Sequence, residues 1–343
     1  MGEATGIEVN NLYKIFGPNG EDMVQKVKDG MSKAELNEKF NHVLGLNDIN
    51  ISMPGGKIQV VMGLSGSGKS TLIRHINRLI DPTAGEVLYG DEDVCKMSQT
   101  ELRDFRRHKT AMVFQKFALL PHRTVMKNAV YGLEIQGVAS KEAEQRAARW
   151  IDRVGLEGFE DHYPNQLSGG MQQRVGLARA LTNDADILLM DEAFSALDPL
   201  IRMDMQTVLL DLQEELNKTI VFITHDLDEA LRLGDRIAIL RDGAVIQQGT
   251  GQEIVLNPAD EYIADFVKEV NRGRVIIVDT VMDKTKTLES GLTVQSGVML
   301  EEAAKAFAET GQGECCVVNG AGKPLGVLNV QDTISAMVTP ATH

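Results

Sequence analysis

The chain has 343 residues, of which 49 are acidic and 35 basic, giving a net charge of −14 with 43% apolar residues. This length is typical of two domains, or of one large domain with an appendage. The acidic excess argues against a dedicated nucleic-acid-binding protein, which usually carries a basic excess. No apolar run reaches the roughly 18–20 residues that a membrane-spanning helix needs. We therefore expect a soluble protein that uses no nucleic acid and reaches a membrane only through another chain.

The compartment is indicated by the cysteines and the amino terminus. Three cysteines are present, Cys95, Cys315 and Cys316. An odd number with two adjacent members favours neither a disulfide framework nor a metal site, and indicates a reducing compartment. The first six residues also lack the basic and apolar regions of a secretory signal. We expect the chain to be cytosolic.

Residues 21–45 are charged and amphipathic. Ser32 and Glu35 have the spacing of a capping box at a helix start, and Gly45 suits the helix end. Leu36, Phe40, Val43 and Leu44 are expected on one helix face. We expect this face to pack on the rest of the same domain.

Three apolar runs, residues 58–62, 187–190 and 219–223, are typical of strands buried on both faces of a parallel sheet. Helical patterns separate them, which predicts an α/β fold. After the first run, the helix-face residues are Leu72, Ile73, Ile76, Leu79 and Ile80. Farther on, residues 237–248 form a hairpin pattern around Asp242-Gly243, a strong two-residue turn signal.

Residues 63–70 have the complete phosphate-binding loop pattern, Gly-Leu-Ser-Gly-Ser-Gly-Lys-Ser, between a strand and a helix. The glycines let backbone N–H groups converge on phosphate oxygens at the positive end of the helix. Lys69 is expected to reach the β- and γ-phosphates, and the Ser70 hydroxyl to bind Mg²⁺. The predicted nucleotide-binding residues here are Gly63, Ser65, Gly66, Ser67, Gly68, Lys69, Ser70 and Thr71.

A second motif ends the strand at 187–190 with two acids, Asp191 and Glu192. Ligands of α/β proteins bind at the carboxyl ends of such strands. Asp191 is therefore expected on the Mg²⁺ side of the site. Glu192 is placed to accept a proton from an attacking water.

A second glycine-rich segment, Leu-Ser-Gly-Gly-Met-Gln at 167–172, precedes a helix predicted at 173–181. This segment resembles the signature motif of ATP-binding cassette (ABC) ATPases. Gln115, after a strand predicted at 111–114, is similar to their Q-loop, and residues 195–198 (Ser-Ala-Leu-Asp) to their D-loop. His225 resembles the switch histidine. Phe16 resembles the aromatic residue that stacks on adenine, with Tyr13 as the alternative.

The resemblance implies a P-loop NTPase fold of the ABC type over residues 1–270, with a helical subdomain at about 116–175. It also implies a homodimer that closes head to tail around ATP and Mg²⁺. In that arrangement Lys69, Ser70 and Asp191 of one protomer hold ATP, Glu192 polarises the water, His225 contacts the γ-phosphate and Gln115 senses Mg²⁺ and water. The capping residues implied for the other protomer are Ser168, Gly169, Gly170 and Asp198.

Residues 11–17, the 21–45 segment and residues 190–202 are similar to the ATPase subunit of glycine betaine/proline betaine/choline importers. Many other importers have Pro-x-x-Ser after the Asp-Glu pair. Ala193-Phe194-Ser195 differs from that pattern and resembles the betaine importers instead. Residues 117–125 resemble the surface that receives a coupling helix of a membrane subunit. The resemblance implies a peripheral subunit on the cytoplasmic side of the inner (plasma) membrane. Its partners would be a membrane permease and, indirectly, a periplasmic or extracellular solute-binding protein.

Two alternatives remain. The chain could be a soluble regulatory ABC ATPase with a ligand-sensing tail, or an importer ATPase for another small solute such as an amino acid. Burial of residues 119–125 and 21–45 within the domain would favour the regulatory alternative.

A domain boundary is predicted near residue 270, followed by a small α+β domain at 274–338. Its predicted elements are strands at 275–278, 315–318 and 325–328, a helix at 300–309 and a short helix from Val330. Residues 314–333 are similar to the second half of a CBS motif, in one copy, which implies a CBS-like regulatory domain. That copy would pair with the other protomer's copy, form a regulatory surface or be a packed remnant, and pairing is the favoured interpretation.

Overall fold

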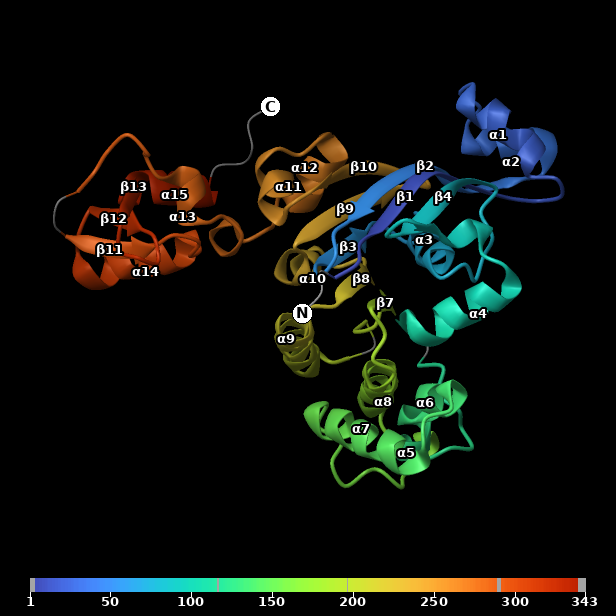
Figure 1. Cartoon of the computed structure of the whole chain (residues 1–343). Helices are drawn as coiled ribbons and strands as arrows, with labels where there is room; N and C mark the ends of the chain where they lie inside the picture. Colours follow the sequence, from blue (N-terminus) through green and yellow to red (C-terminus); the bar gives the residue numbers. More distant parts are fainter. Residues whose placement is uncertain (1–3, 116, 196, 289–290, 339–343) are drawn as a thin grey trace. The chain divides into compact units, whose positions relative to one another are not determined.

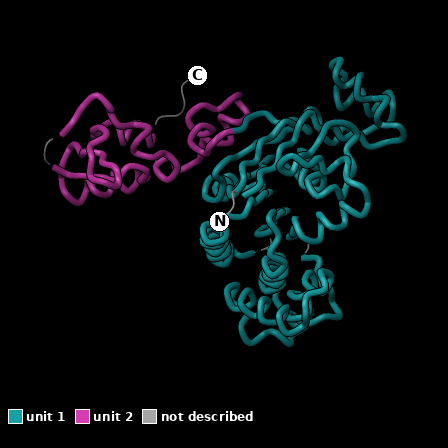
Figure 2. The backbone as a smooth tube through the Cα atoms, viewed as in Figure 1, with its two compact units in different colours: residues 1–248 teal, residues 249–343 magenta. Residues whose placement is uncertain are grey.

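The computed structural model describes residues 4–115, 117–195, 197–288 and 291–338. It divides into two compact units, Met1–Gln248 and Gly249–His343 (Figure 2). The helices that follow the last strand of the first unit therefore group with the tail. The observed division lies earlier in the chain than the boundary predicted near residue 270. Within the described ranges, no helix is both long enough and apolar enough to cross a bilayer.

A six-stranded sheet forms the centre of the first unit (Figure 1). In sheet order its strands are β10 (Ala244–Gly249), β9 (Arg236–Arg241), β3 (Ile58–Met62), β8 (Thr219–Thr224), β7 (Ile187–Asp191) and β6 (Thr110–Val113). The pairs β9–β3, β3–β8, β8–β7 and β7–β6 are parallel. Every residue of β3, β7 and β8 is buried, which confirms the prediction of strands covered on both faces. The hairpin at Asp242-Gly243 is also confirmed, with φ values of 52° and 84°.

The helices of this layer are α3 (Lys69–Ile76), α4 (Gln99–His108), α9 (Pro199–Leu216) and α10 (Leu227–Leu233), with a 3₁₀ turn η1 (Val94–Lys96). Helix α3 is shorter than predicted. It ends at Ile76, and Arg78 has a positive φ of 49°, so Leu79 and Ile80 lie beyond the helix. The prediction ran too far because Leu79 and Ile80 continue the apolar spacing of the helix, and this spacing does not reveal where the backbone leaves the helical conformation.

An antiparallel sheet that was not predicted packs on this core. Its order is β2 (Val43–Met53), β1 (Ile7–Phe16), β4 (Ala84–Tyr89) and β5 (Glu92–Asp93). One apolar cluster joins the two sheets: Val9 and Ile49 belong to it together with Leu189 and Val221. The nucleotide-side loops of the parallel sheet therefore have a rigid neighbour.

The segment between β1 and β2 forms two helices, α1 (Glu21–Lys28) and α2 (Lys33–Phe40). The Ser32–Glu35 capping box is confirmed. The prediction that Gly45 ends the helix was wrong: Asn41, with φ 55°, is the helix end, and Gly45 lies within β2. Asn is the residue other than Gly that is also found in this left-handed conformation at helix ends. Val43 and Leu44 are accordingly strand residues.

The helical subdomain contains α5 (Val125–Ala129), α6 (Tyr131–Gln136), α7 (Ser140–Arg153), a 3₁₀ turn η2 (Pro164–Gln166) and α8 (Gly169–Thr182). Helix α8 packs on α5, α6 and α7 and leads to β7 (Figure 1). It begins four residues before the predicted helix at 173–181, and extends beyond the predicted subdomain limit of 175. Lys116, at the other limit, lies outside the described residues.

The second unit has its own core around a three-stranded sheet, β11 (Leu292–Gln295), β12 (Glu314–Val318) and β13 (Pro324–Asn329). Its helical elements are α11 (Gly251–Leu256), α12 (Glu261–Val267), η3 (Arg272–Arg274), α13 (Val278–Val281), α14 (Leu300–Thr310) and α15 (Val330–Val338). The predicted elements from residue 300 onward are confirmed. The strand predicted at 275–278 is wrong: this run makes only an isolated bridge, Ile277 to Met299, and the third strand is β11. Four apolar residues are too few for periodicity to separate a strand from a buried irregular segment.

Candidate nucleotide-binding site

The loop from Gly63 to Gly68 joins β3 to α3 in a conformation that requires glycine. Gly63, Gly66 and Gly68 have φ values of 148°, 80° and 105°. A Cβ on Gly63 would lie 2.2 Å from the Leu240 carbonyl oxygen, so no side chain fits there. The Gly243 N–H in the β9–β10 turn donates to the Ser67 carbonyl at 3.0 Å, which holds the loop from outside.

Lys69 and Ser67 supply polar groups under this loop. Lys69 is 4% exposed, and its Nζ donates to the carbonyls of Gly63 (2.7 Å) and Leu64 (3.0 Å). Burial lowers the pKa of Lys69, while the charges of Glu192 and Asp191 raise it. Ser67 Oγ is buried and has no hydrogen-bond partner among the described residues. A cation and an unsatisfied hydroxyl below a curled loop suit the oxygens of a polyphosphate.

Two oxygen ligands meet at the carboxyl edge of the sheet. Ser70 Oγ donates to Asp191 Oδ1 at 2.8 Å, although the two residues are 121 positions apart. Asp191 is 3% exposed, and burial raises its pKa while the hydrogen bond from Ser70 lowers it. This pair matches the oxygen donor set that Mg²⁺ prefers.

Glu192 is the centre of a second cluster. Its Oε2 accepts a hydrogen bond from Gln115 Nε2 at 2.8 Å and lies 3.6 Å from Nδ1 of His225. Glu192 has φ 47°, an uncommon conformation for a residue with a side chain, and its N–H donates to the Ile223 carbonyl at 3.1 Å. The three side chains follow β6, β7 and β8, so the sheet order brings them together.

Lys69, Ser70, Gln115, Glu192 and His225 line one cavity of about 600 Å³, whereas Gly63, Ser67 and Asp191 are not among its described lining residues. The lining residues are Phe16, Lys33, Val43, Leu44, Gly45, Leu64, Ser65, Gly66, Gly68, Lys69, Ser70, Thr71, Gln115, Glu192 and His225. Phe16 is 40% exposed, whereas Tyr13 is 5% exposed and belongs to a small apolar core with Ile15. Sequence reasoning missed Lys33, Val43, Leu44 and Gly45 as lining residues. No motif marks them: Lys33 lies in the connection between β1 and β2, and the other three lie at the start of β2.

The predicted capping residues lie elsewhere in the chain. Ser168 precedes α8 and its Oγ accepts from the Met171 N–H at 3.3 Å; Asp198 precedes α9 and accepts from the Ile201 N–H at 3.1 Å. Among the residues that the structure describes, Ser168, Gly169, Gly170 and Asp198 do not line the cavity. Ala196 of the predicted D-loop lies outside the described residues.

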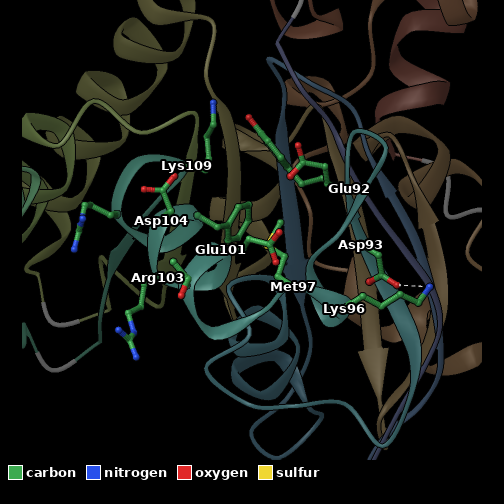
Figure 3. Close-up of a pocket in the computed structure, with 12 residues that line it drawn as sticks. Glu92, Asp93, Lys96, Met97, Glu101, Arg103, Asp104 and Lys109 are labelled. Atoms are coloured by element: carbon green, nitrogen blue, oxygen red, sulfur yellow. Dashed lines mark ion pairs between the residues drawn. The ribbon is translucent and has the colours of Figure 1, made fainter.

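A larger cavity, of about 960 Å³, lies between the β4–β5 ribbon and α4 (Figure 3). Its lining includes both acidic side chains (Glu92, Asp93, Glu101 and Asp104) and basic ones (Lys96, Arg103, Arg107 and Lys109). Lys96 and Asp93 already form an ion pair at 2.8 Å. Within the described ranges, its lining includes no residue of the predicted nucleotide site. Donor chemistry, and not volume, therefore identifies the functional site.

Comparison with known proteins agrees with this chemistry. The sequence model of the ABC transporter family matches residues 46–195. The glycine betaine transport ATP-binding protein OpuAA of Bacillus subtilis is 54% identical over 282 residues, covering 82% of this chain and 68% of that protein. The glycine betaine/proline betaine transport system ATP-binding protein ProV of Salmonella typhimurium is 46% identical over 339 residues, 98% and 84% of the two chains. The trimethylamine N-oxide transport system ATP-binding protein TmoW of Pelagibacter ubique is 46% identical, covering 87% and 88%.

Among solved structures, the dimeric ATP-binding cassette MJ0796 in a post-hydrolysis state, bound to ADP and Pi, superposes with a TM-score of 0.62 at 33% identity. The alignment covers 71% of this chain and 98% of that one. The α/β P-loop fold of the ABC type is thus confirmed. The chain is an ATPase of the ABC transporter family and belongs, within it, to the glycine betaine/proline betaine transport ATP-binding proteins.

Proposed function

We propose that this chain hydrolyses ATP to drive the import of a quaternary amine (glycine betaine, choline or proline betaine) through a membrane permease. The observation that carries the catalytic part is the cluster of Gln115, Glu192 and His225 beside the phosphate-binding loop. The substrate class rests on relatives named for glycine betaine and proline betaine transport.

ATP would lie along the cavity with its base on Phe16 and its phosphates in the loop from Gly63 to Gly68. Phe16 supports base stacking because its ring is exposed to the cavity, whereas Tyr13 is occupied in the core. Lys69 is placed to exchange its carbonyl partners for β- and γ-phosphate oxygens. Thr71, also in the lining, follows on the first turn of α3.

The residues also fit Mg²⁺. Ser70 and Asp191 would hold the ion, with Gln115 near it, and the phosphates and water would complete the six ligands that Mg²⁺ prefers. Bound there, Mg²⁺ would supply neutralisation of phosphate charge. Burial raises the pKa of Asp191, so its carboxylate is poorly solvated without a partner and would gain from a bound cation.

Glu192 would accept the proton of the attacking water. Gln115 holds the Glu192 carboxylate in place, and the strained backbone at Glu192 aims that carboxylate into the cavity. His225, on the neighbouring strand end, would contact the γ-phosphate. A positioned carboxylate of this kind contributes about 10²–10⁴-fold to a hydrolysis rate.

Completion of the site requires a second copy of the chain. The helix starts at Ser168 and Asp198 are exposed and lie outside the cavity of their own chain. In a head-to-tail homodimer, Ser168, Gly169 and Gly170 of one protomer would cap the ATP of the other with the positive end of α8. The dimeric MJ0796 cassette supports this arrangement.

The permease would dock on residues 119–125. Pro121 and His122 are exposed, Leu119 and Leu120 are half-buried, and Val125 is buried, so part of this surface remains accessible. The inserted helices are likewise largely accessible. Accessibility favours a transporter subunit over the regulatory alternative. The chain would work on the cytoplasmic side of the membrane, and the permease would receive solute from a binding protein on the other side.

The second unit would regulate rather than catalyse. We assign residues 274–338 to a single CBS-like domain, built on the β12–β13 pair and α15, with residues 1–270 as the nucleotide-binding domain. Pairing of this domain with its copy in the other protomer is the favoured arrangement.

The test is affinity purification of the tagged chain from gently solubilised native membranes, followed by ATPase assays of the recovered complex. We expect a polytopic subunit to copurify. We also expect a quaternary amine (glycine betaine, proline betaine or choline), presented with its binding protein, to stimulate hydrolysis more than trimethylamine N-oxide or methionine does. Recovery of a homodimer alone would overturn the transporter assignment. Stimulation by trimethylamine N-oxide or methionine only would overturn the substrate class.

A further inference from the structure

The inserted helices α1 and α2 are fixed to the nucleotide side of the first unit. Val27 of α1 and Leu36 of α2 are buried with Tyr13, Ile15 and Leu44 of the β1–β2 pair. At the ends of the insertion, the two ring nitrogens of His42 lie 2.6 Å from the Phe40 carbonyl and 2.7 Å from the Pro18 carbonyl. The pair is therefore a rigid extension of the strands that carry Phe16.

Lys33 is the residue that this extension brings to the nucleotide cavity. It is the first residue of α2, and the Ser32–Glu35 capping box sets that helix start, with Glu35 N–H donating to Ser32 Oγ at 3.2 Å. Lys33 lines the cavity together with Phe16 and Val43. Its Nζ lies 4.0 Å from Asp242 Oδ1.

The position of Asp242 shows which part of the cavity Lys33 lies beside. Asp242 directly precedes Gly243, whose N–H holds the Ser67 carbonyl of the phosphate-binding loop. A Cβ on Gly68 would lie 3.5 Å from the Gly243 Cα. Lys33 thus lies in the interval between the aromatic ring of Phe16 and the carboxyl-terminal end of the loop, at Ser67 and Gly68. In a nucleotide with its base on Phe16 and its terminal phosphates at Lys69, this interval holds the ribose and the α-phosphate.

We infer that Lys33 is an additional nucleotide-binding residue, whose ammonium donates to an α-phosphate oxygen of ATP or ADP. The inference rests on the proposed placement of ATP in the cavity. The insertion between β1 and β2 then has a direct part in nucleotide affinity, in addition to its packing.

The existing partner of Lys33 does not prevent this exchange. The side chains of Lys33 and Asp242 are 41% and 80% exposed, and their 4.0 Å separation is long for an ion pair. Exposed pairs of this kind contribute little to the stability of a protein. A phosphate oxygen offers a full negative charge and a shorter hydrogen bond, so it is the stronger partner.

The experiment measures ATP and ADP affinity of the full chain by calorimetry in EDTA, where ATP is not hydrolysed. We expect Lys33→Gln to weaken ATP and ADP binding by the same factor, about tenfold for a lost charge-assisted hydrogen bond. Lys33→Arg should retain most of the affinity. In the Mg²⁺-dependent assay, KM should rise for Lys33→Gln while kcat stays unchanged.

Lys39→Gln is the matched control. Lys39 lies on the same helix, and its Nζ bonds Glu35 at 3.0 Å, away from the cavity lining. An unchanged affinity for Lys33→Gln, or an equal loss for Lys39→Gln, would overturn the inference, as would a loss confined to ATP, which would indicate the γ-phosphate. Lys69→Ala separates the two proposals. If Lys69→Ala abolishes binding while Lys33→Gln changes nothing, only the role of Lys33 fails; if Lys69→Ala binds normally, the proposed ATP site fails.

Discussion

The two ends of the nucleotide cavity are built in opposite ways. At the phosphate end, Lys69 and Asp191 are 4% and 3% exposed, and they follow strands that are buried along their whole length. At the nucleoside end, Phe16 and Val43 are 40% and 47% exposed, and they are cross-strand partners at the end of the antiparallel β1–β2 pair. The phosphate end places charges in the core, while the nucleoside end offers a surface.

The difference in burial between the two ends suggests that one end serves ATP hydrolysis and the other serves nucleotide affinity. Buried charges and a strained Glu192 backbone cost stability, and such features persist where function depends on them. Under the proposed placement of ATP, exposed groups such as Phe16 and Lys33 would cost little stability and would adjust the strength of nucleotide binding. We therefore expect substitutions at the phosphate end to change kcat and stability, and substitutions at the nucleoside end to change KM.

Glu192→Gln should have the largest effect. Removing the proton acceptor is expected to lower kcat by about 10²-fold or more while ATP still binds. ATP should therefore accumulate in a stable dimer, detectable by size-exclusion chromatography with light scattering. Glu214→Gln, on the exposed face of α9, is the control and should behave as the parent chain. A Glu192→Gln variant that hydrolyses ATP at the normal rate would contradict the assignment of hydrolysis to the phosphate end.

Phe16→Ala should raise KM for ATP by about tenfold, with kcat unchanged, because stacking of a base on an aromatic ring contributes about 1–3 kcal/mol. Phe40→Ala is a matched control, since Phe40 is 37% exposed on α2 and does not line the cavity. Steady-state kinetics across ATP concentration distinguishes the two. A fall in kcat for Phe16→Ala would contradict the assignment of affinity to this end.

Asp191→Asn should stabilise the nucleotide-free chain while abolishing Mg²⁺-dependent hydrolysis. Burial raises the pKa of Asp191 above 3.8, so the folded chain keeps this proton at pH values where the unfolded chain has lost it. The buried carboxylate is then destabilising above its raised pKa, and the penalty disappears as the pH falls below 3.8.

We expect a Tm about 2 °C higher for Asp191→Asn at pH 7.5, and a difference that shrinks as the pH is lowered. Differential scanning calorimetry in EDTA measures it, with the exposed Asp204→Asn as control. A lower Tm for Asp191→Asn at pH 7.5 would show that the buried Asp191 carboxylate does not destabilise the folded chain.

Truncation after residue 272 should have the smallest effect. Both ends of the cavity belong to the first unit, so kcat and KM of the isolated protein should stay within about twofold. Because Leu256 of α11 packs against the core of the second unit, a second truncation after residue 248 controls for the exposed apolar surface. Loss of ATP hydrolysis in both variants would make the tail part of the catalytic unit.

The phosphate end could be predicted from sequence almost completely. Its residues lie in short segments where one backbone conformation is required, such as the loop at Gly63–Gly68, or where an unbroken apolar run demands burial, as in β7. Local chemistry decides both, so a single sequence reveals them. The α14 to α15 portion of the second unit was predictable for the same reason.

The nucleoside end was decided by tertiary structure. The choice of Phe16 over Tyr13 for the cavity, the place of Gly45 in β2 rather than at a helix end, and the arrival of Lys33 all depend on how β1 and β2 pair and where their connection folds back. The same holds for Gln115, Glu192 and His225, whose motifs are recognisable separately. Only the order of β6, β7 and β8 brings them together, because contacts between distant segments follow from strand pairing, which local sequence patterns do not encode.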